Sequence, residues 1–423
     1  MPHLGAIADD FTGATDLATM LVARGFRTVV AVGVPGGGQD AADVPAEADA
    51  VVVALKSRTA PTGQAVAESV AALRALRAAG CERFYFKYCS TFDSTPRGNI
   101  GPVADALLDE LGAPGTVVVP AFPATGRTVY RARLFVHDDL LDESPMRDHP
   151  LTPMRDSHLG RLLAPQTVRA VHRVPHETVR AGAGAVREAL DAPQARDALT
   201  VVDATTDDDL RTIAAATAHL PLVTGAAGLA LGLTGPHGDQ ESARARATGR
   251  GPAAVLSGSA SAATRAQVGH ARRVLPSRAL DPQALRADLE GAVAGLVAFA
   301  TGCWREDPGR PPLIYATGEE TAVPGSADPG AAQLVETALA RCATALVAAG
   351  ARHLLVAGGE TSGAVVTALG ARTLRIGAPI APGVAWAHTE AVSDGSAHPV
   401  DLALKSGNFG GTDLFTTAWG ALS

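Results

Sequence analysis

The sequence predicts an α/β protein of two domains with largely parallel sheets and a ligand cleft between them. Three observations support this. Short runs rich in β-branched residues alternate with Ala- and Leu-rich stretches of helical length. Glycine follows several of these stretches, where a left-handed residue commonly ends a helix. A polar segment over residues 236–252 interrupts the alternation, which then restarts. We therefore expect domains over residues 1–235 and 253–423, joined by a linker over 236–252.

The individual elements follow from the same pattern. In the first domain we expect strands at Leu4–Ala8, Thr28–Val34, Ala50–Ala54, Arg83–Phe86, Thr116–Val119 and Thr200–Asp203, and helices at Ala14–Arg24, Gln64–Ala79 and Ile100–Leu111. In the second we expect strands at Ala253–Leu256, Leu313–Ala316 and His353–Ala357, and helices at Ala262–Leu275, Asp328–Ala349 and Thr361–Leu369.

Composition excludes several classes of protein. The chain has 423 residues, of which 47% are hydrophobic, and a formal net charge of −7, so no basic surface for nucleic acid is expected. The start of the chain has no leader pattern, and the longest uncharged run, residues 212–238, contains prolines and glycines that are unlike a membrane span. Four cysteines without a CxxC pair suit a reducing compartment. We expect a soluble cytoplasmic protein without a nucleic-acid or membrane partner, and composition leaves room for a homo-oligomer.

Two rare residue types mark the segments of interest. Lysine occurs only at positions 56, 87 and 405 among 36 basic residues, and asparagine only at positions 99 and 408. A chain that uses arginine wherever a surface charge suffices keeps lysine where a compact ammonium is needed. All five residues lie in polar or glycine-rich segments.

Polar side chains follow two expected strands of the first domain. Asp9 and Asp10 come directly after the first strand, and Lys56 and Arg58 follow the third. Ligands of parallel sheets bind beyond the carboxyl ends of the strands. The two carboxylates can accept hydrogen bonds from hydroxyl groups or hold a metal, and the cationic loop suits a carboxylate.

A third segment, residues 86–101, is too polar to be only a turn. It leaves a strand and enters a helix through Lys87, Asp93, Ser94, Arg97 and Asn99. Arg97 offers a planar fork for a carboxylate, and Asp93 could deprotonate a hydroxyl group. Cys89 lies in the same segment, but no histidine is near it in sequence, so we interpret it as a small buried thiol.

The second domain contains four turns of small and hydroxyl residues. They include the loop with Ser257, Ser259 and Ser261, the GGETSG segment and the loop with the last lysine. Two of these turns open expected helices, whose free N–H groups attract anions. We therefore predict a nucleotide site here. The P-loop pattern GxxxxGK[ST] and a GxGxxG after the first strand are both absent.

Taken together, ADDFTGATD, DSTPRGNIG, GGETSG and LKSGNFG resemble the four-carbon acid sugar kinase family over essentially the whole chain. The resemblance implies an N-terminal domain that binds a sugar acid and a C-terminal domain that binds ATP. It implies substrate contacts from Asp9, Asp10, Lys56, Arg58, Lys87, Asp93, Ser94, Arg97 and Asn99. It also implies ATP contacts from Ser257, Ser259, Ser261, Gly358, Gly359, Glu360, Thr361, Ser362, Gly363, Lys405, Gly407 and Asn408.

The implied reaction is phosphorylation of the terminal hydroxyl of a four-carbon sugar acid by ATP with Mg²⁺, with metal ligands that the sequence does not identify. Segments such as VVVALKSRT and PAFPATGRTVY most resemble members that act on a 3-oxo acid. Threonate and erythronate kinases, the alternative, usually carry a second lysine where Tyr88 follows Lys87. A non-catalytic sensor is a third alternative, disfavoured by the retained acids. Asp93, or one of Asp9 and Asp10, would take the hydroxyl proton, and the sequence does not decide which. Ala132 departs from the family, in which we expect glycine.

Overall fold

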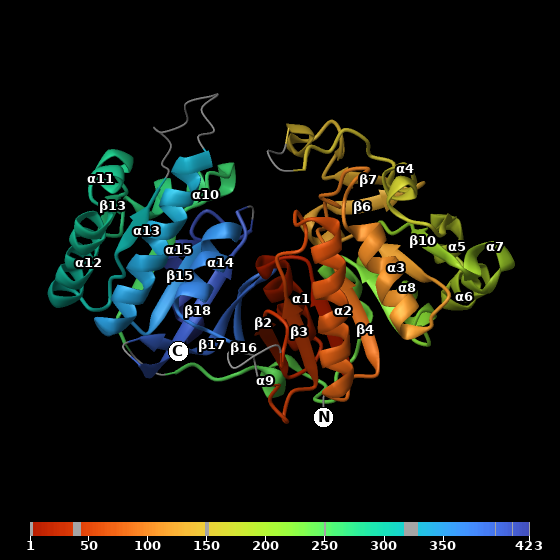
Figure 1. The fold of residues 1–423 in the computed structure, drawn as a ribbon, viewed down its shortest axis with the longest axis horizontal. Coiled ribbons are helices and arrows are strands. Elements are labelled where there is room, and N and C mark those ends of the chain that lie inside the picture. The colour runs from red at the N-terminus through yellow and green to blue at the C-terminus, as the bar shows by residue number, and fades with distance from the viewer. Residues whose placement is uncertain are drawn as a thin grey trace. The chain divides into compact units, whose positions relative to one another are not determined.

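The computed structural model describes residues 3–36, 44–148, 152–248, 251–316, 329–393, 395–407 and 409–422 of the chain. Two compact units make up the protein, Met1–Ala243 and Arg244–Ser423 (Figure 1). Each unit is an α/β unit with a largely parallel sheet, as the sequence predicts.

The main sheet of the first unit contains eight strands: β1 (Leu4–Ala8), β2 (Thr28–Val32), β3 (Ala50–Ala54), β4 (Arg83–Lys87), β5 (Thr116–Val119), β9 (Ala170–Val174), β10 (Ala198–Val202) and β11 (Leu222–Gly225). They lie in the order β2-β3-β1-β4-β11-β5-β10-β9 and pair in parallel. β1, β3, β5 and β10 are buried along their whole length, which explains their nearly continuous apolar sequences. Their carboxyl ends carry the loops of interest.

The helices of this unit are α1 (Phe11–Ala23), α2 (Thr62–Ala78), α3 (Ile100–Leu111), α4 (Leu159–Leu163), α5 (His176–Arg180), α6 (Ala183–Asp191), α7 (Pro193–Arg196), α8 (Asp207–Ala216) and α9 (Gln240–Ala243), with short 3₁₀ turns η1 (Pro123–Thr125), η2 (Pro145–Asp148), η3 (Ala164–Gln166) and η4 (Ala227–Gly232). The predicted helix ends at Gly25, Gly80 and Gly112 are confirmed, and all three glycines have positive φ. Helix α1 begins at Phe11, three residues before the predicted start, because the Asp10 carboxylate caps it.

A small antiparallel sheet that the sequence pattern does not predict follows β5. Its strands are β6 (Arg127–Tyr130), β7 (Arg133–Val136) and β8 (Asp139–Leu140). The turn between β6 and β7 consists of Arg131 and Ala132, both with positive φ, and the buried Asp203 carboxylate accepts both of their N–H groups at 2.7 and 2.8 Å. A glycine would suit the positive φ of Ala132, which is a physical reason for the expected residue there.

The second unit contains strands β12 (Ala253–Ser257), β13 (Ser277–Ala279), β14 (Leu313–Tyr315), β15 (His353–Ala357), β16 (Thr373–Ala381), β17 (Val384–Ser393) and β18 (Ser396–Lys405). Their order is β13-β14-β12-β15-β18-β17-β16, with β17 antiparallel to both neighbours. Its helices are α10 (Ala262–Ala271), α11 (Pro282–Ala287), α12 (Leu289–Glu306), α13 (Pro329–Ala348), α14 (Gly359–Ala368) and α15 (Leu414–Thr417), followed by the 3₁₀ turn η6 (Ala418–Leu422).

Within the described residues, one helical stretch, Gly330–Ala348 of α13, has the length and apolar composition of a membrane span. It packs against α12 and α14 in the second unit. Ala338, Leu339, Cys342 and Leu346 of this helix are fully buried, as in the core helix of a globular domain.

The predicted linker is attached to both units. Its His237 N–H donates to Gly25 O at 3.1 Å in the first unit, and α9 lies within the segment expected to be irregular. In the second unit, Thr248 donates through its N–H and its hydroxyl to Asp401 at 3.0 and 2.7 Å. The change between units therefore falls inside the predicted linker, between Ala243 and Arg244.

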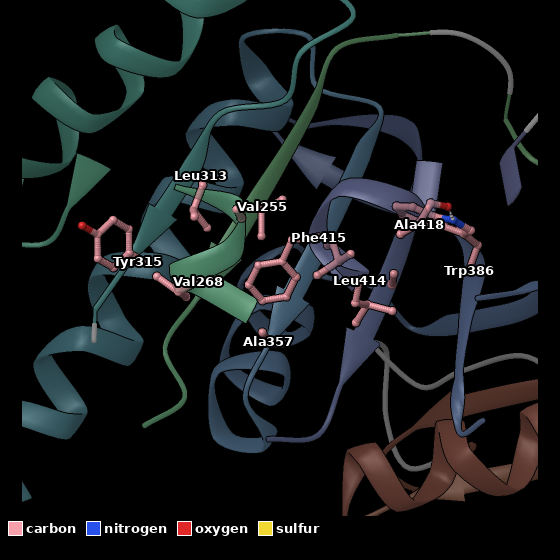
Figure 2. Close-up of a cluster of buried hydrophobic side chains, with 12 residues drawn as sticks. Val255, Val268, Leu313, Tyr315, Ala357, Trp386, Leu414, Phe415 and Ala418 are labelled. Carbon is pink, nitrogen blue, oxygen red and sulfur yellow. Dashed lines mark hydrogen bonds between the residues drawn. The ribbon is translucent and has the colours of Figure 1, made fainter. Parts of the chain in front are cut away.

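The C-terminal helix completes the core of the second unit. Phe415 is fully buried and lies in one apolar cluster with Val255, Val268 and Ala357 (Figure 2). The Trp386 indole N–H donates to the carbonyl of Ala418 at 3.0 Å and so ties the last turn to strand β17. Leu414, Phe415 and Ala418 are therefore part of the core of this unit.

The Phe415→Leu variant is expected to lose about 1–2 kcal/mol of free energy of unfolding, since a buried ring is replaced by a smaller side chain that leaves a cavity. Urea unfolding followed by tryptophan fluorescence measures the loss, with the exposed Val274→Ala variant as the control. An unchanged midpoint would show that the terminal helix contributes nothing to the core.

Candidate active site

The first unit gathers its polar residues around Arg58. The guanidinium donates to both oxygens of Asp9, from Nη2 at 2.8 Å and from Nε at 2.9 Å. Its Nη2 also lies 2.8 Å from Asp10 Oδ1, and its Nη1 lies 3.5 Å from Asp93 Oδ2. Residues from the ends of β1, the loop after β3 and the loop after β4 therefore meet, as the strand-end rule predicts.

Burial and charge act in opposite directions on these carboxylates. Burial raises the pKa of Asp9, and the charge of Arg58 opposes this only in part. Burial would also raise the pKa of Asp10, but the charges of Arg58 and Lys87 outweigh it and hold this pKa below its ordinary value. The cluster thus contains one carboxyl group that resists ionisation beside one that favours it.

Asp10 has two tasks, because it also caps α1. Its Oδ1 accepts the N–H of Gly13 and its Oδ2 accepts the Thr12 hydroxyl, both at 2.9 Å. A Cβ at Gly13 would lie 2.2 Å from Asp10 Oδ1 and 3.1 Å from Lys87 Nζ. Only glycine at position 13 lets the carboxylate and the ammonium approach the helix this closely.

Lys87 is the buried cation of the cluster. Its side chain is 3% exposed, and its Nζ donates to Tyr88 O at 3.0 Å and lies 3.8 Å from Asp16 Oδ2. Burial raises the pKa of Asp16 to about 6. Asp16 Oδ1 is buried and has no hydrogen-bond partner among the described residues.

The loop after β4 holds Asp93 in strained backbone. Phe92 and Asp93 both have positive φ, 64° and 27°, in the region that favours glycine. The Thr91 hydroxyl donates to Asp93 Oδ1 at 2.6 Å. Among the described residues, Asp93 Oδ2 has only the long contact with Arg58, so it is the less engaged oxygen of this carboxylate.

Two further predicted residues support these loops. The Asn99 amide donates to Ser57 O and Ala60 O, both at 2.8 Å, and so fixes the loop that carries Arg58. Ser94 Oγ accepts from Gln166 Nε2 at 3.0 Å, which leaves the hydroxyl proton of Ser94 free to donate elsewhere.

Lys56 and Arg97 differ from the other predicted residues, because both side chains are exposed. Lys56 Nζ lies over the Phe11 ring, 5.8 Å from its centroid, and within the described residues neither cation makes an ion pair with the cluster. The structure does not bring these two residues together with the others.

Cys89 is only partly buried, so the small buried thiol interpreted from the sequence is not confirmed. Its Sγ lies 2.9 Å from the Thr91 hydroxyl, and burial raises its pKa to about 12. The nucleophilic thiolate is therefore absent at neutral pH. The Tyr88 side chain is fully buried, and its hydroxyl lies 3.0 Å from Thr224 Oγ1, so Tyr88 is part of the core beneath the loop after β4.

Two charged residues of this site, Asp16 and Arg127, are not predicted from the sequence. Asp16 lies on α1 beside Lys87, and Arg127 begins β6 with its guanidinium within electrostatic range of Cys89, Asp93 and Asp16. Both residues lie in segments that carry the family resemblance, GATD and PAFPATGRTVY, but the sequence pattern gives neither residue a function.

In the second unit, the start of α10 and the end of β18 meet at Lys405. The Ser261 side chain caps α10 by accepting from Thr264 N at 3.2 Å. The hydroxyls of Ser261 and Thr264 donate to Gly407 O at 2.5 and 2.8 Å. A Cβ at Gly407 would lie 2.9 Å from Ser259 Oγ, so these turns are in close contact.

Lys405 is fully buried without a carboxylate beside it. Its Nζ donates to Thr264 Oγ1 at 2.7 Å and to Gly407 O at 2.8 Å, and within the described chain it forms no ion pair. Burial lowers the pKa of Lys405 to about 7. An uncompensated ammonium at the carboxyl end of a parallel strand is suited to receive a phosphate.

The start of α14 offers backbone donors beside it. Gly358, with φ 126°, precedes Gly359 and the helix without a side-chain cap. A Cβ at Gly258 would lie 2.2 Å from Thr361 Oγ1, so the loops before α10 and α14 approach closely. The Ser257 and Ser362 hydroxyls are buried without a hydrogen-bond partner among the described residues.

The remaining residues predicted to contact ATP are placed as follows. Glu360 is exposed in the first turn of α14, and Gly363 is buried one turn further on. Asn408 lies outside the described residues.

A carboxylate-rich cluster in one α/β unit and glycine turns around a buried lysine in the other are the arrangement expected for a sugar-acid kinase, the class to which the named relatives belong. A family described as sugar-binding N-terminal domain matches residues 4–233, and one described as nucleotide-binding C-terminal domain matches residues 254–415. The chain belongs to the four-carbon acid sugar kinase family.

Relatives extend over the whole chain. The 3-oxo-tetronate kinase of Burkholderia multivorans is 50% identical, over 100% of this chain and 97% of its own length. The 3-oxo-tetronate kinase of Salmonella typhimurium LT2 is 42% identical over 99% of both chains. A solved structure from the same strain, described as a candidate tRNA synthase, is similar with a TM-score of 0.86 at 40% identity over 99% of both chains.

Proposed function

We propose that the chain transfers the γ-phosphoryl group of ATP to the 4-hydroxyl of 3-oxo-tetronate in the cytoplasm. The observation that carries this proposal is the full-length similarity to enzymes named 3-oxo-tetronate kinase, at 42–50% identity. The charge pattern agrees with it, since one unit presents an acidic cluster with buried cations and the other an anion site.

Asp93 is the proposed proton acceptor in preference to Asp10. Both oxygens of Asp10 accept short hydrogen bonds that hold α1 and its cap, whereas Asp93 Oδ2 has only a long contact with Arg58. A carboxylate with one open oxygen can take the proton of the attacking hydroxyl. Lys87 and Ser94 would donate hydrogen bonds to the substrate.

The triphosphate would bind the N–H groups at the start of α14 and the ammonium of Lys405. A helix start carries a partial positive charge, and Lys405 has no anion of its own. Mg²⁺ in such sites keeps most ligands as water and phosphate oxygens and needs only one or two carboxylates. Glu360 fits this need, because its exposed carboxylate lies in that first turn; the ion supplies charge neutralisation on the phosphates.

The 3-oxo acid is expected to exceed D-threonate and D-erythronate in kcat/KM by at least about tenfold, equivalent to about 1.4 kcal/mol. Its C3 carbonyl only accepts hydrogen bonds, and Lys87 and Ser94 have protons to donate. In D-threonate and D-erythronate C3 is tetrahedral and carries a hydroxyl group, whose proton needs an acceptor that a site built for a carbonyl does not supply.

A coupled ADP-release assay with the three acids measures this ratio. Equal or reversed values would favour a threonate or erythronate kinase, and no turnover of any acid would favour a sensor without catalysis.

ATP binding at pH 8 is expected to take up close to one proton. Burial lowers the pKa of Lys405 to about 7, so the free protein holds this side chain mostly neutral at pH 8, whereas a bound triphosphate favours the ammonium. Affinity should therefore fall as pH rises above 7, by up to about tenfold per pH unit.

Calorimetry in buffers of different ionisation enthalpy measures the proton uptake, and Lys405→Met should abolish it. A heat of binding that does not depend on the buffer would contradict the assignment of Lys405 to the triphosphate.

A further inference from the structure

Among the described residues, Arg127 is a cation beside the acidic cluster that no carboxylate of the cluster pairs with. Arg58 is engaged by Asp9, Asp10 and Asp93, and Lys87 faces Asp16. An acid that enters this site therefore competes for Arg58 with carboxylates that already occupy its Nε and Nη2.

Arg127 differs from those cations. Its Nη1 donates to the carbonyl of Thr125, and its Nε is buried without a hydrogen-bond partner among the described residues. Within the same residues it forms no ion pair. A guanidinium has five N–H donors in a planar fork, which matches the two oxygens of a carboxylate.

The backbone holds Arg127 firmly at the edge of the acidic cluster. Phe122 N donates to Arg127 O at 2.8 Å, and Arg127 N donates to Phe122 O at 3.1 Å. The far end of the hairpin is fixed by Asp203 through the turn at Arg131 and Ala132. Burial lowers the pKa of Arg127, while nearby Asp93 and Asp16 oppose this.

A guanidinium that has no ion pair among the described residues and lies within electrostatic range of Asp93 suits a short substrate with a carboxylate at one end and a reacting hydroxyl at the other. We propose that Arg127 binds the carboxylate of the sugar acid and thereby distinguishes an acid from a neutral sugar, an inference that rests on the proposed function. Arg97 and Lys56, the cations that the sequence favours for this task, are exposed.

The test compares two substrates that differ only at the carboxylate. Erythrulose replaces the carboxylate of the 3-oxo acid with a hydroxymethyl group and keeps the ketone and the reacting hydroxyl. We measure kcat and KM for both in the wild type, Arg127→Gln, Arg127→Lys and the control Arg77→Gln, whose side chain is exposed on α2. If erythrulose is not phosphorylated, its inhibition constant replaces KM.

Arg127→Gln should raise KM for the acid by about 10- to 100-fold, as expected for a lost hydrogen bond to a charged group. Its kcat for the acid, and its KM or inhibition constant for erythrulose, should stay within about threefold of the wild-type values. Arg127→Lys keeps the positive charge but loses the planar pair of N–H donors, so its KM for the acid should lie between those of Arg127→Gln and the wild type. It also carries the test if the Gln variant does not fold.

An equal loss for both substrates, or no loss, would overturn the role of Arg127 and leave the proposed function standing. A wild type that does not phosphorylate the acid would instead overturn the proposed function.

Discussion

The Asp93→Asn variant is expected to lose about 10²- to 10⁴-fold in kcat, which is the usual contribution of a general base. An asparagine at position 93 can still form hydrogen bonds with the substrate, so KM for the acid should stay within about threefold. The structure favours this residue because its Oδ2 is the least engaged oxygen in the cluster around Arg58.

Steady-state kinetics checks this prediction, with Asp109→Asn as the control, since the Asp109 side chain is 72% exposed on α3. Near-normal turnover in Asp93→Asn would move the base to another carboxylate. Asp10→Asn would then be the next variant to measure.

The Arg58→Met variant is expected to lose about 3–5 kcal/mol of free energy of unfolding near pH 8, the cost of removing one partner from a buried ion pair. Asp9, Asp10 and Asp93 would then face one another without their shared cation. The Asp9 side chain is 7% exposed and the Arg58 side chain 21%, so solvent replaces little of the lost interaction.

The loss should shrink as the pH falls toward 5. Without Arg58 the pKa values of Asp9 and Asp10 rise in the folded variant, because Arg58 lowers both in the wild type; the folded state then binds protons more readily than the unfolded chain and gains stability at lower pH. In the wild type, the lowered pKa of Asp10 acts in the opposite direction, because its stabilising contribution is lost as the pH falls.

Urea unfolding of both proteins at pH 8, 7, 6 and 5 measures the difference, and Arg77→Met is the matched surface control. A difference that stays constant with pH would show that Arg58 stabilises the fold by packing rather than by charge.

The sequence predicts that polar residues at the strand ends lie close together, but it identifies only some of the charged residues of the site. Asp9, Asp10, Arg58 and Asp93 meet because parallel strands align their carboxyl ends at one edge of the sheet, which can be expected from the alternation of strands and helices. Rare lysines are informative at Lys87 and Lys405, both buried, and not at Lys56, which is exposed.

Arg127 could not be found in the same way. Arginine is the common cation of this chain, so its presence at one position carries no signal. Its hairpin follows a strand end through a 3₁₀ turn and is held by Asp203, a contact between residues more than seventy positions apart. Asp16 looks like an ordinary helix residue until β4 places Lys87 beside it.

The left-handed backbone at Phe92 and Asp93 has a consequence for attempts to make this protein more heat-resistant. Non-glycine residues in this conformation store about 1–2 kcal/mol each, and here they adjoin the carboxylate proposed to accept a proton. Substituting glycine for Phe92 relieves that strain but removes a buried ring that packs edge-on against Tyr88 at 5.7 Å and holds the loop in place. The strained loop that positions Asp93 lowers the free energy of unfolding of the protein. Variants of this loop selected for resistance to heat would therefore tend to lose the position of Asp93 and to be slower enzymes.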